Sequence, residues 1–228
     1  MRIENESPRL EWIRSAIASL PVGSRLLDAG AGEQRFRTDC DHLEYVSQDF
    51  GQYNPAILDA GMQVKTWDYG KLDIVCDITN IPKPDASFDA ILCIEVLEHI
   101  PDPQAAIREF SRLLKPGGTL ILTAPFCSLT HFAPHHHCTG FNRYFYEKWL
   151  PELGFTITEL QANGSYFQFI GQEVNRIPEV CNRYSKPVSW LTRAAIQLML
   201  FALSICEKTD RGSAELLCFG YHVKAIRT

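Results

Sequence analysis

Apolar runs of strand length alternate with helical patterns along most of this chain. The runs span residues 26–29, 44–49, 73–77, 88–94, 119–123, 155–160 and 215–227. Because most of them are continuously apolar instead of alternating with polar positions, they are typical of parallel strands covered on both faces. The pattern therefore predicts an α/β fold around a buried, mainly parallel sheet.

Helical spacing of apolar residues separates these runs. It predicts helices at about 7–19, 147–153, 164–184 and 188–208. A further helix is expected to begin at Asp102-Pro103, with its apolar residues up to Leu114 facing inward. Residues 194–206 form the most apolar stretch, and its apolar side chains fall on all sides of a helix. We expect this helix to be buried against the sheet or in a homodimer interface. Peripheral membrane or lipid contact through 188–208 is the alternative. Its 13 apolar residues are fewer than the ~20 that span a bilayer, so no transmembrane segment is expected.

Composition and charge narrow the picture. The chain has 228 residues, of which 46% are hydrophobic, and this suits one domain with an elaboration. The net charge of −5 lacks the basic excess of a nucleic-acid binder, so no nucleic-acid partner is expected. The eight cysteines contain no CxxC pair, and no apolar leader follows Met1. We therefore expect free thiols and a cytoplasmic location.

A glycine loop is the strongest local signal. The buried run 26–29 leads into Gly30 and Gly32, where the backbone can approach a ligand without a Cβ in the way. Arg35 stands where the dinucleotide motif GxGxxG has its third glycine, and so disfavours a nicotinamide cofactor. Instead, one carboxylate falls at each of three strand ends, which suits an adenosine carrying an amino acid better than a pyrophosphate. These carboxylates belong to Asp28, Asp49 and Asp77.

Three segments carry a family resemblance. They are DAGAG at 28–32, FDAILCIEVLEHIPDP at 88–103 and LLKPGGTLILTAP at 113–125. Together they resemble the class I (Rossmann-like) S-adenosylmethionine-dependent methyltransferases over roughly residues 22–160, with Gln34 in place of a third glycine. The resemblance implies a three-layer sandwich with a seven-stranded, mostly parallel sheet and an antiparallel last strand. It also implies one domain, 1–228, in which a core at 22–160 and a last strand at 215–227 flank a helical insertion at 164–208.

The same resemblance assigns roles to residues. It implies that S-adenosylmethionine is bound by Asp28, Gly30 and Gly32 at its methionine end, Asp49 at its ribose, Asp77 and Ile78 at its adenine, and Glu95 near its methyl group. Candidates for a general base are His131, His135 and Glu95, because they follow the fourth and fifth strands. No metal is expected, and the E-x-x-E-H arrangement of Glu95, Glu98 and His99 is the alternative.

These observations favour in-line methyl transfer to a small-molecule, glycan or lipid-intermediate acceptor. Two other functions stay open. A nicotinamide-dependent oxidoreductase is disfavoured by Arg35 and by the carboxylate-rich rim of the site. A non-catalytic Rossmann-like binding protein is disfavoured because the chain keeps the whole set of expected cofactor-binding residues.

Overall fold

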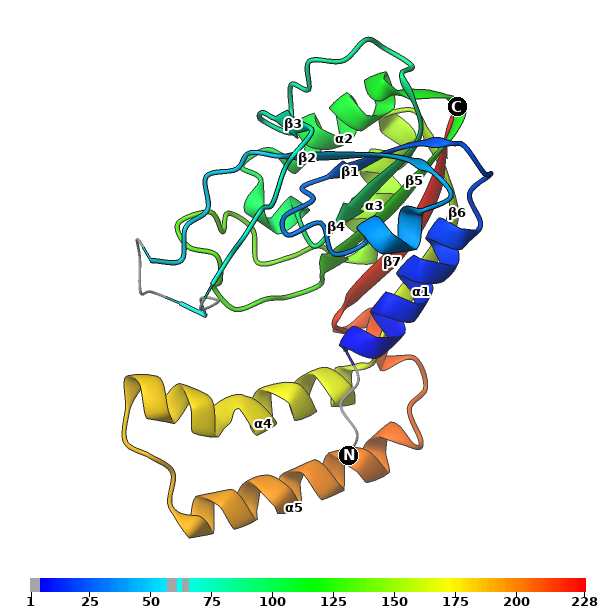
Figure 1. The fold of residues 1–228 in the computed structure, drawn as a ribbon. Coiled ribbons are helices and arrows are strands. Elements are labelled where there is room, and N and C mark those ends of the chain that lie inside the picture. The colour runs from blue at the N-terminus through cyan, green and yellow to red at the C-terminus, as the bar shows by residue number, and fades with distance from the viewer. Residues whose placement is uncertain (1–4, 57–60, 63–65) are drawn as a thin grey trace. The chain divides into compact units, whose positions relative to one another are not determined.

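A seven-stranded mixed sheet organises the computed structural model, which describes residues 5–56, 61, 62 and 66–228 (Figure 1). The strand order is β3-β2-β1-β4-β5-β7-β6. The strands are β1 (Arg25–Ala29), β2 (Glu44–Asp49), β3 (Ile74–Val75), β4 (Phe88–Ile94), β5 (Leu114–Pro125), β6 (Phe155–Asn163) and β7 (Gly220–Arg227). β1 runs parallel to β2 and β4, whereas β7 runs antiparallel to β5. The expected α/β class with an antiparallel last strand is confirmed.

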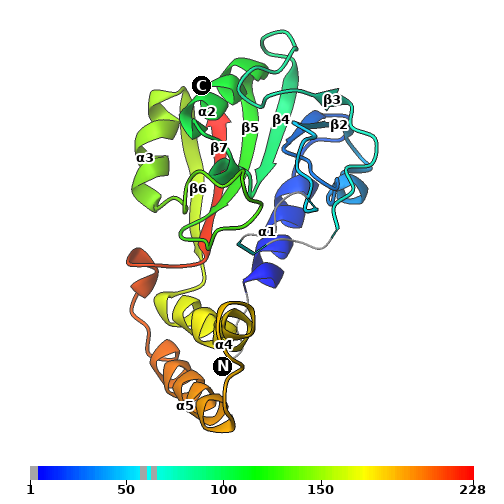
Figure 2. The same cartoon turned by 90° about the vertical axis from the view of Figure 1, so that its left-hand side faces the viewer.

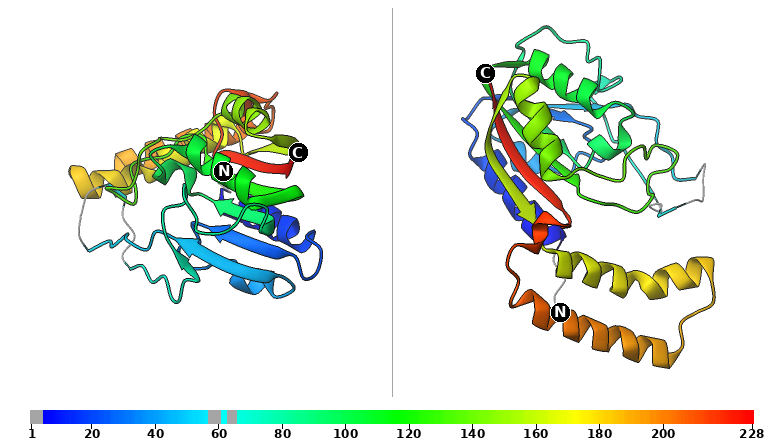
Figure 3. Two further views of the ribbon diagram at one scale, coloured as in Figure 1. Left: turned by 90° about the horizontal axis from the view of Figure 1, so that it is seen from above. Right: turned by 180° about the vertical axis from the view of Figure 1, so that it is seen from behind.

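Helices cover both faces of this sheet. They include α1 (Glu6–Ala18), α2 (Pro103–Leu113) and α3 (Arg143–Glu152). Two further helices, α4 (Tyr166–Tyr184) and α5 (Trp190–Glu207), belong to a separate compact unit. On β7, His222 stacks on Trp12 of α1, while its neighbour Tyr221 contacts Tyr146 of α3. Because successive strand residues point to opposite faces, α1 and α3 must lie on opposite sides of the sheet, as Figures 2 and 3 show.

Two predicted boundaries shift for local reasons. β3 is shorter than the predicted 73–77, because the Asp73 carboxylate accepts hydrogen bonds from the backbone N and Oγ of Ser47, both at 2.9 Å. Leu114, predicted to face inward from a helix, instead begins β5 in extended conformation. Pro116 disfavours helical backbone at the residue before it, so the helix ends early. After the glycine loop comes a short 3-10 helix at Arg37–Cys40.

The chain divides into two compact units. One holds the sheet and comprises residues 10–161 and 220–228, and the other comprises 1–9 and 162–219 with α4 and α5. All eight cysteines are free thiols, as expected.

Within this chain, α5 is covered on one side only, so the expected burial on more than one face is not met here, and burial in a homodimer interface stays a prediction. Only Ile196 and Leu200 are buried in it, and α5 packs against α4. Its exposed large apolar residues are Trp190, Leu191, Leu198, Met199, Phe201 and Ile205. By length and composition alone, Trp190–Glu207 would also suffice to cross a membrane, with a mean hydropathy of 1.3 over 18 residues. The count of 13 residues in the apolar stretch therefore underestimated the length of helix that meets this criterion.

Candidate functional site

The glycine loop follows β1 and is held by the neighbouring strand β2. The backbone N–H groups of Gly30 and Ala31 both donate to the carbonyl oxygen of Gln48, at 2.9 and 2.8 Å. Gly30 has a φ of +77°, and a Cβ placed on it would lie 2.5 Å from the side chain of Val96. Left-handed backbone and lack of space therefore both require glycine at this position.

Asp49 fastens the second glycine of this loop. Its Oδ2 accepts from the backbone N of Gly32 at 2.9 Å, and its Oδ1 accepts from the backbone N of Gly51 at 3.0 Å. Burial raises the pKa of the Asp49 carboxyl, and these backbone N–H groups partly offset that effect. Sequence reasoning expected a ribose-binding acid here, but it missed this anchoring contact.

A group of aromatic rings beside the glycine loop was also missed. A Cβ on Gly32 would lie 2.8 Å from the ring of Trp67. Trp67 in turn contacts Tyr53 and Phe132, with ring centroids 5.7 and 4.9 Å apart. These residues come from three separate segments, so their spacing in the sequence carries no common signal. They form an apolar wall against which a flat ligand group could pack.

Gln34 keeps the loop in shape although it is not glycine. Its φ of +56° is unusual for a residue with a side chain. The side-chain amide donates to the carbonyl oxygens of Tyr69 and Lys71, at 2.7 and 3.0 Å. These bonds hold a left-handed conformation that glycine would adopt without strain.

Asp28 lies in a closed environment. Its side chain is buried, and Oδ2 accepts from the hydroxyl of Tyr45 at 2.6 Å. Burial raises the pKa of Asp28 to about 7, and the Tyr45 hydrogen bond offsets only part of that rise. Near neutral pH its charge is therefore sensitive to any cation that approaches it.

The remaining predicted cofactor residues lie at two strand ends. β3 ends at Val75, two residues before Asp77. The exposed Asp77 accepts from the backbone N and Oγ1 of Thr79, both at 2.8 Å, and Ile78 beside it is buried. Glu95 directly follows β4 with a φ of +54°. Its Oε1 accepts from the Thr123 hydroxyl at 2.9 Å, and its backbone N donates to the carbonyl oxygen of the same residue.

The structure separates the two candidate base histidines. His131 lies with Glu98 and His99, and ligand atoms of these three residues are all within 4.8 Å of one another. Burial, and then the neighbouring His131, lower the pKa of His99 to about 3. His135 instead sets its ring against Phe50, the residue after Asp49, at 4.9 Å between centroids. Glu95 is not in the group of three that could hold a metal, so the predicted set Glu95, Glu98 and His99 is not the one brought together.

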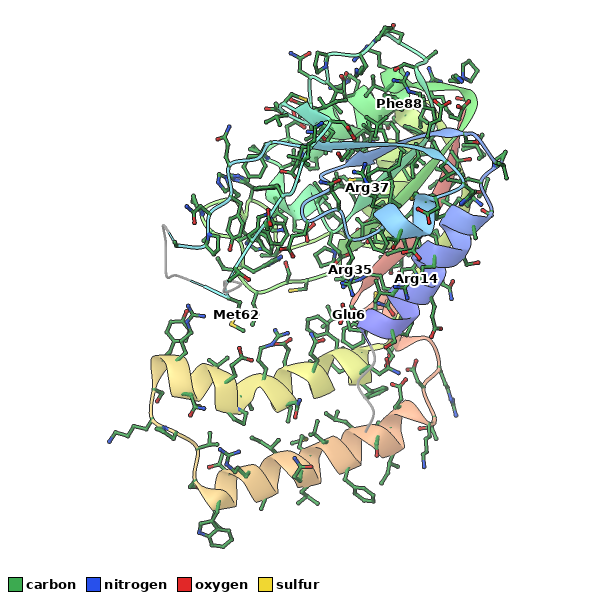
Figure 4. All side chains as sticks on the ribbon, in the orientation of Figure 1. Glu6, Arg14, Arg35, Arg37, Met62 and Phe88 are labelled. Carbon is green, nitrogen blue, oxygen red and sulfur yellow. The ribbon has the colours of Figure 1, made fainter. Side chains whose placement is uncertain are left out.

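The loop that carries His131 is tied to the segment containing Met62, which Figure 4 labels. The backbone N of Met62 donates to the carbonyl oxygen of Thr130 at 2.7 Å. Met62 and His131 also form an isolated parallel bridge. These contacts anchor the loop that supplies the candidate histidines.

Comparison with known proteins agrees with this geometry. Residues 27–122 match the family model described as a methyltransferase domain. Ubiquinone biosynthesis O-methyltransferases from Xanthomonas axonopodis pv. citri and Dechloromonas aromatica are 34% and 30% identical over 122 residues. Those residues make up 50% of this chain and 48% and 49% of theirs, so the chain spans about half the length of the curated relatives it matches.

Solved structures share the fold at low identity. The [4+2]-cyclase SpnF matches with a TM-score of 0.58 at 22% identity, covering 96% of this chain and 80% of its own. A geranyl diphosphate methyltransferase in complex with GPP and sinefungin matches at 0.57 and 15%, covering 98% and 78%. With the glycine loop and the strand order, the family-model match over residues 27–122 supports a class I (Rossmann-like) S-adenosylmethionine-dependent methyltransferase domain in this chain.

Proposed function

We propose that this chain transfers a methyl group from S-adenosylmethionine to an oxygen atom of a small-molecule acceptor with an apolar tail. The observation that carries the first part is the glycine loop, closed by the Gly32–Asp49 hydrogen bond at the ends of β1 and β2. Oxygen is proposed as the methylated atom because the curated relatives are named O-methyltransferases. Because SpnF shares the fold and is a cyclase, the fold alone does not establish the activity.

The residues around the loop fit this cofactor. Gly30 and Gly32 leave room where a Cβ would collide, and Trp67 offers an apolar face. Asp49 adds carboxylate oxygens that can accept from ribose hydroxyls, while Asp28 can face the amino group. The bound cofactor supplies a sulfonium methyl group that is already activated, so the protein mainly has to orient the acceptor and exclude water.

We propose Glu95 and His135 as the residues nearest the reacting acceptor. Glu95 is held in a strained conformation at the end of β4, which is a common feature of functional positions. His135 packs on Phe50, beside the cofactor-side Asp49. His131 is a weaker candidate for the base, because its Nε2 lies 3.9 Å from the Glu98 carboxylate.

Asp49→Ala tests the cofactor site. The substitution removes acceptors for buried hydroxyls and the anchor of Gly32, so affinity for S-adenosylhomocysteine in calorimetry should fall by about 1–3 kcal/mol, or roughly 5- to 150-fold. Asp41→Ala, at an exposed carboxylate, is the matched control and should bind like the parent. Equal affinity of Asp49→Ala and parent would refute the assignment. Binding of NAD by the parent would favour the oxidoreductase alternative.

The second part of the proposal, an apolar acceptor met at a membrane surface, rests on α5. Leu191, Leu198 and Ile205 are seven residues apart and therefore lie on one side of the helix, together with the exposed Phe201. Trp190 begins this stripe and is 75% exposed. Tryptophan is enriched at the interface between lipid and water.

Charge complements this apolar stripe. Residues 180–206 contain Arg183, Lys186 and Arg193 and no acidic residue, whereas the whole chain carries a net charge of −5. All three basic side chains are exposed. An apolar helix face with nearby basic residues is the pattern of a helix that lies in an anionic membrane surface. A cytoplasmic location with peripheral membrane contact is part of this proposal.

Vesicle flotation tests the membrane contact. The full chain should float with vesicles containing anionic phosphatidylglycerol and much less with neutral phosphatidylcholine vesicles. Phe201→Asp should reduce the floating fraction at least about tenfold, because it places a charge in the exposed apolar face that would enter the lipid. Val22→Asp, at a still more exposed valine in the other compact unit, should float like the parent. A stable homodimer that does not float would show that α5 pairs with a second copy instead.

A further inference from the structure

A buried carboxylate and a phenol meet just before the glycine loop. Asp28 belongs to β1, and Tyr45 belongs to the neighbouring strand β2. The register pairs Leu26 with Tyr45, and residues 26 and 28 point to the same face of the sheet, so the Tyr45 ring shares the face of Asp28. Its hydroxyl donates to Oδ2 of Asp28 at 2.6 Å. The phenol therefore fixes one oxygen of a side chain that is only 3% exposed.

The other groups that face Asp28 supply no cation to balance its charge. On β2, Asp49 adds a second negative charge. Cys40 of the 3-10 helix and Cys93 of β4 also face it, but burial raises the pKa of both thiols, that of Cys40 to about 12, so both stay neutral near pH 7. The guanidinium of Arg37 lies over the tyrosine ring, 5.2 Å from its centroid. Within the described ranges, no basic side chain is ion-paired with Asp28.

A carboxyl group in such surroundings keeps its proton until a cation arrives. Taking an ionised carboxylate out of water costs free energy, and the hydrogen bond from a neutral phenol returns only part of it. The pKa of Asp28 is accordingly raised to about 7, mainly by burial. Without the Tyr45 hydroxyl the pKa would lie higher still, because that hydrogen bond favours the ionised form. A cation placed beside Asp28 would lower the pKa and release the proton.

We propose that Tyr45 is a positioning residue for the cofactor, and that it holds the Asp28 carboxyl group ready to lose its proton when the ammonium group of the cofactor's amino-acid end binds beside it. In this step the O–H bond of the carboxylic acid breaks and the proton passes to the solvent buffer, while no bond of the cofactor changes. Asp28 faces the amino group only under the proposed function, on which this inference rests. Cofactor affinity is then linked to pH through Tyr45, which acts only through Asp28.

Calorimetric titration of the full chain with S-adenosylhomocysteine tests this linkage, in phosphate and in Tris so that exchanged protons are counted. Because about half of Asp28 is protonated near pH 7, binding should release about 0.5 proton per chain at that pH. Affinity should rise about tenfold from pH 6 to pH 8, since the ionised fraction rises from about 0.1 to about 0.9. 5′-Methylthioadenosine lacks the amino-acid part and should bind without proton release.

Tyr45→Phe separates an effect on charge from an effect on structure. The substitution raises the pKa of Asp28, so affinity should fall about fivefold at pH 7 and return to within about twofold of the parent at pH 8.5. A merely structural loss would weaken binding equally at both pH values. Asp28→Asn should bind more weakly than the parent at pH 8 and show no pH dependence. Tyr184→Phe, at an exposed tyrosine of the other compact unit, should keep the parent's profile.

Three results would overturn the linkage although the cofactor site is real. They are S-adenosylhomocysteine binding whose affinity does not change with pH, proton release that persists in Asp28→Asn or equals that with methylthioadenosine, and a Tyr45→Phe loss of the same factor at pH 7 and pH 8.5. A parent that does not bind S-adenosylhomocysteine at all would instead refute the proposed function, and the linkage with it.

Discussion

Gly30→Ala should destabilise the chain by about 2–4 kcal/mol, because it combines left-handed backbone with overpacking. The new Cβ would lie 2.5 and 2.7 Å from the two methyl groups of Val96. Gly23 provides a matched control, since its φ of +80° is nearly the same as that of Gly30, but a Cβ there meets nothing within 4 Å. Gly23→Ala should therefore cost only the backbone part, about 1 kcal/mol.

Urea denaturation of the two variants and of Val96→Ala measures this difference. The double variant Gly30→Ala with Val96→Ala should recover part of the loss, because the shortened Val96 side chain no longer meets the added methyl. Additive effects of the two substitutions would contradict the collision. Cofactor binding should fall in Gly30→Ala and recover with the double variant, since the same loop forms the proposed site.

The second large effect is expected from Asp28→Asn and depends on pH. The pKa of Asp28 rises from 3.8 to about 7 because of burial, so the folded state holds this proton more tightly than the unfolded chain. Stability linked to Asp28 is therefore fully present below about pH 4 and is lost as pH rises towards 7. Asparagine stays neutral, so the variant should exceed the parent in stability by an increment that grows to roughly 3–4 kcal/mol at pH 8.

Thermal or urea unfolding of the free protein at several pH values tests this expectation. Tyr45→Phe provides the complementary change. In the parent the Tyr45 hydroxyl donates to Asp28 and lowers the pKa of Asp28, and the substitution removes that hydroxyl. Because the pKa of Asp28 then lies higher still, that variant should keep losing stability at pH values where the loss in the parent has levelled off. If the gap between Asp28→Asn and parent were constant from pH 4 to 8, the carboxyl would not titrate in this range. Cofactor affinity is a separate readout, and Asp28→Asn should weaken it if Asp28 faces the amino group.

Local pattern accounts for most of the sheet. β2 and β4 have the predicted ends, because continuous apolar runs bounded by polar residues define a buried strand. The start of α2 also follows from the sequence, since Asp102 caps it through the backbone N of Ala105 at 2.9 Å. In the site, the need for glycine at position 30 could be read from the loop motif before its collision partner was known.

Contacts between distant segments decided the rest. His99 meets the carbonyl of His135 across 36 residues, and Asp49 meets Gly32 across 17, so no local spacing reports either contact. The sequence grouped Glu95 with Glu98 and His99, whereas the folded loop brings His131 to Glu98 instead.

The sequence by itself determined the order of strands and helices, the glycine loop and the acids at the strand ends, because these depend on local periodicity and backbone conformation. Tertiary structure alone decided which side chains meet and which faces stay exposed. The apolar residues of α5 show the difference, since composition predicts burial but the covering surface must come from another element. In this fold α4 covers Ile196 and Leu200, and the opposite stripe of α5 remains exposed.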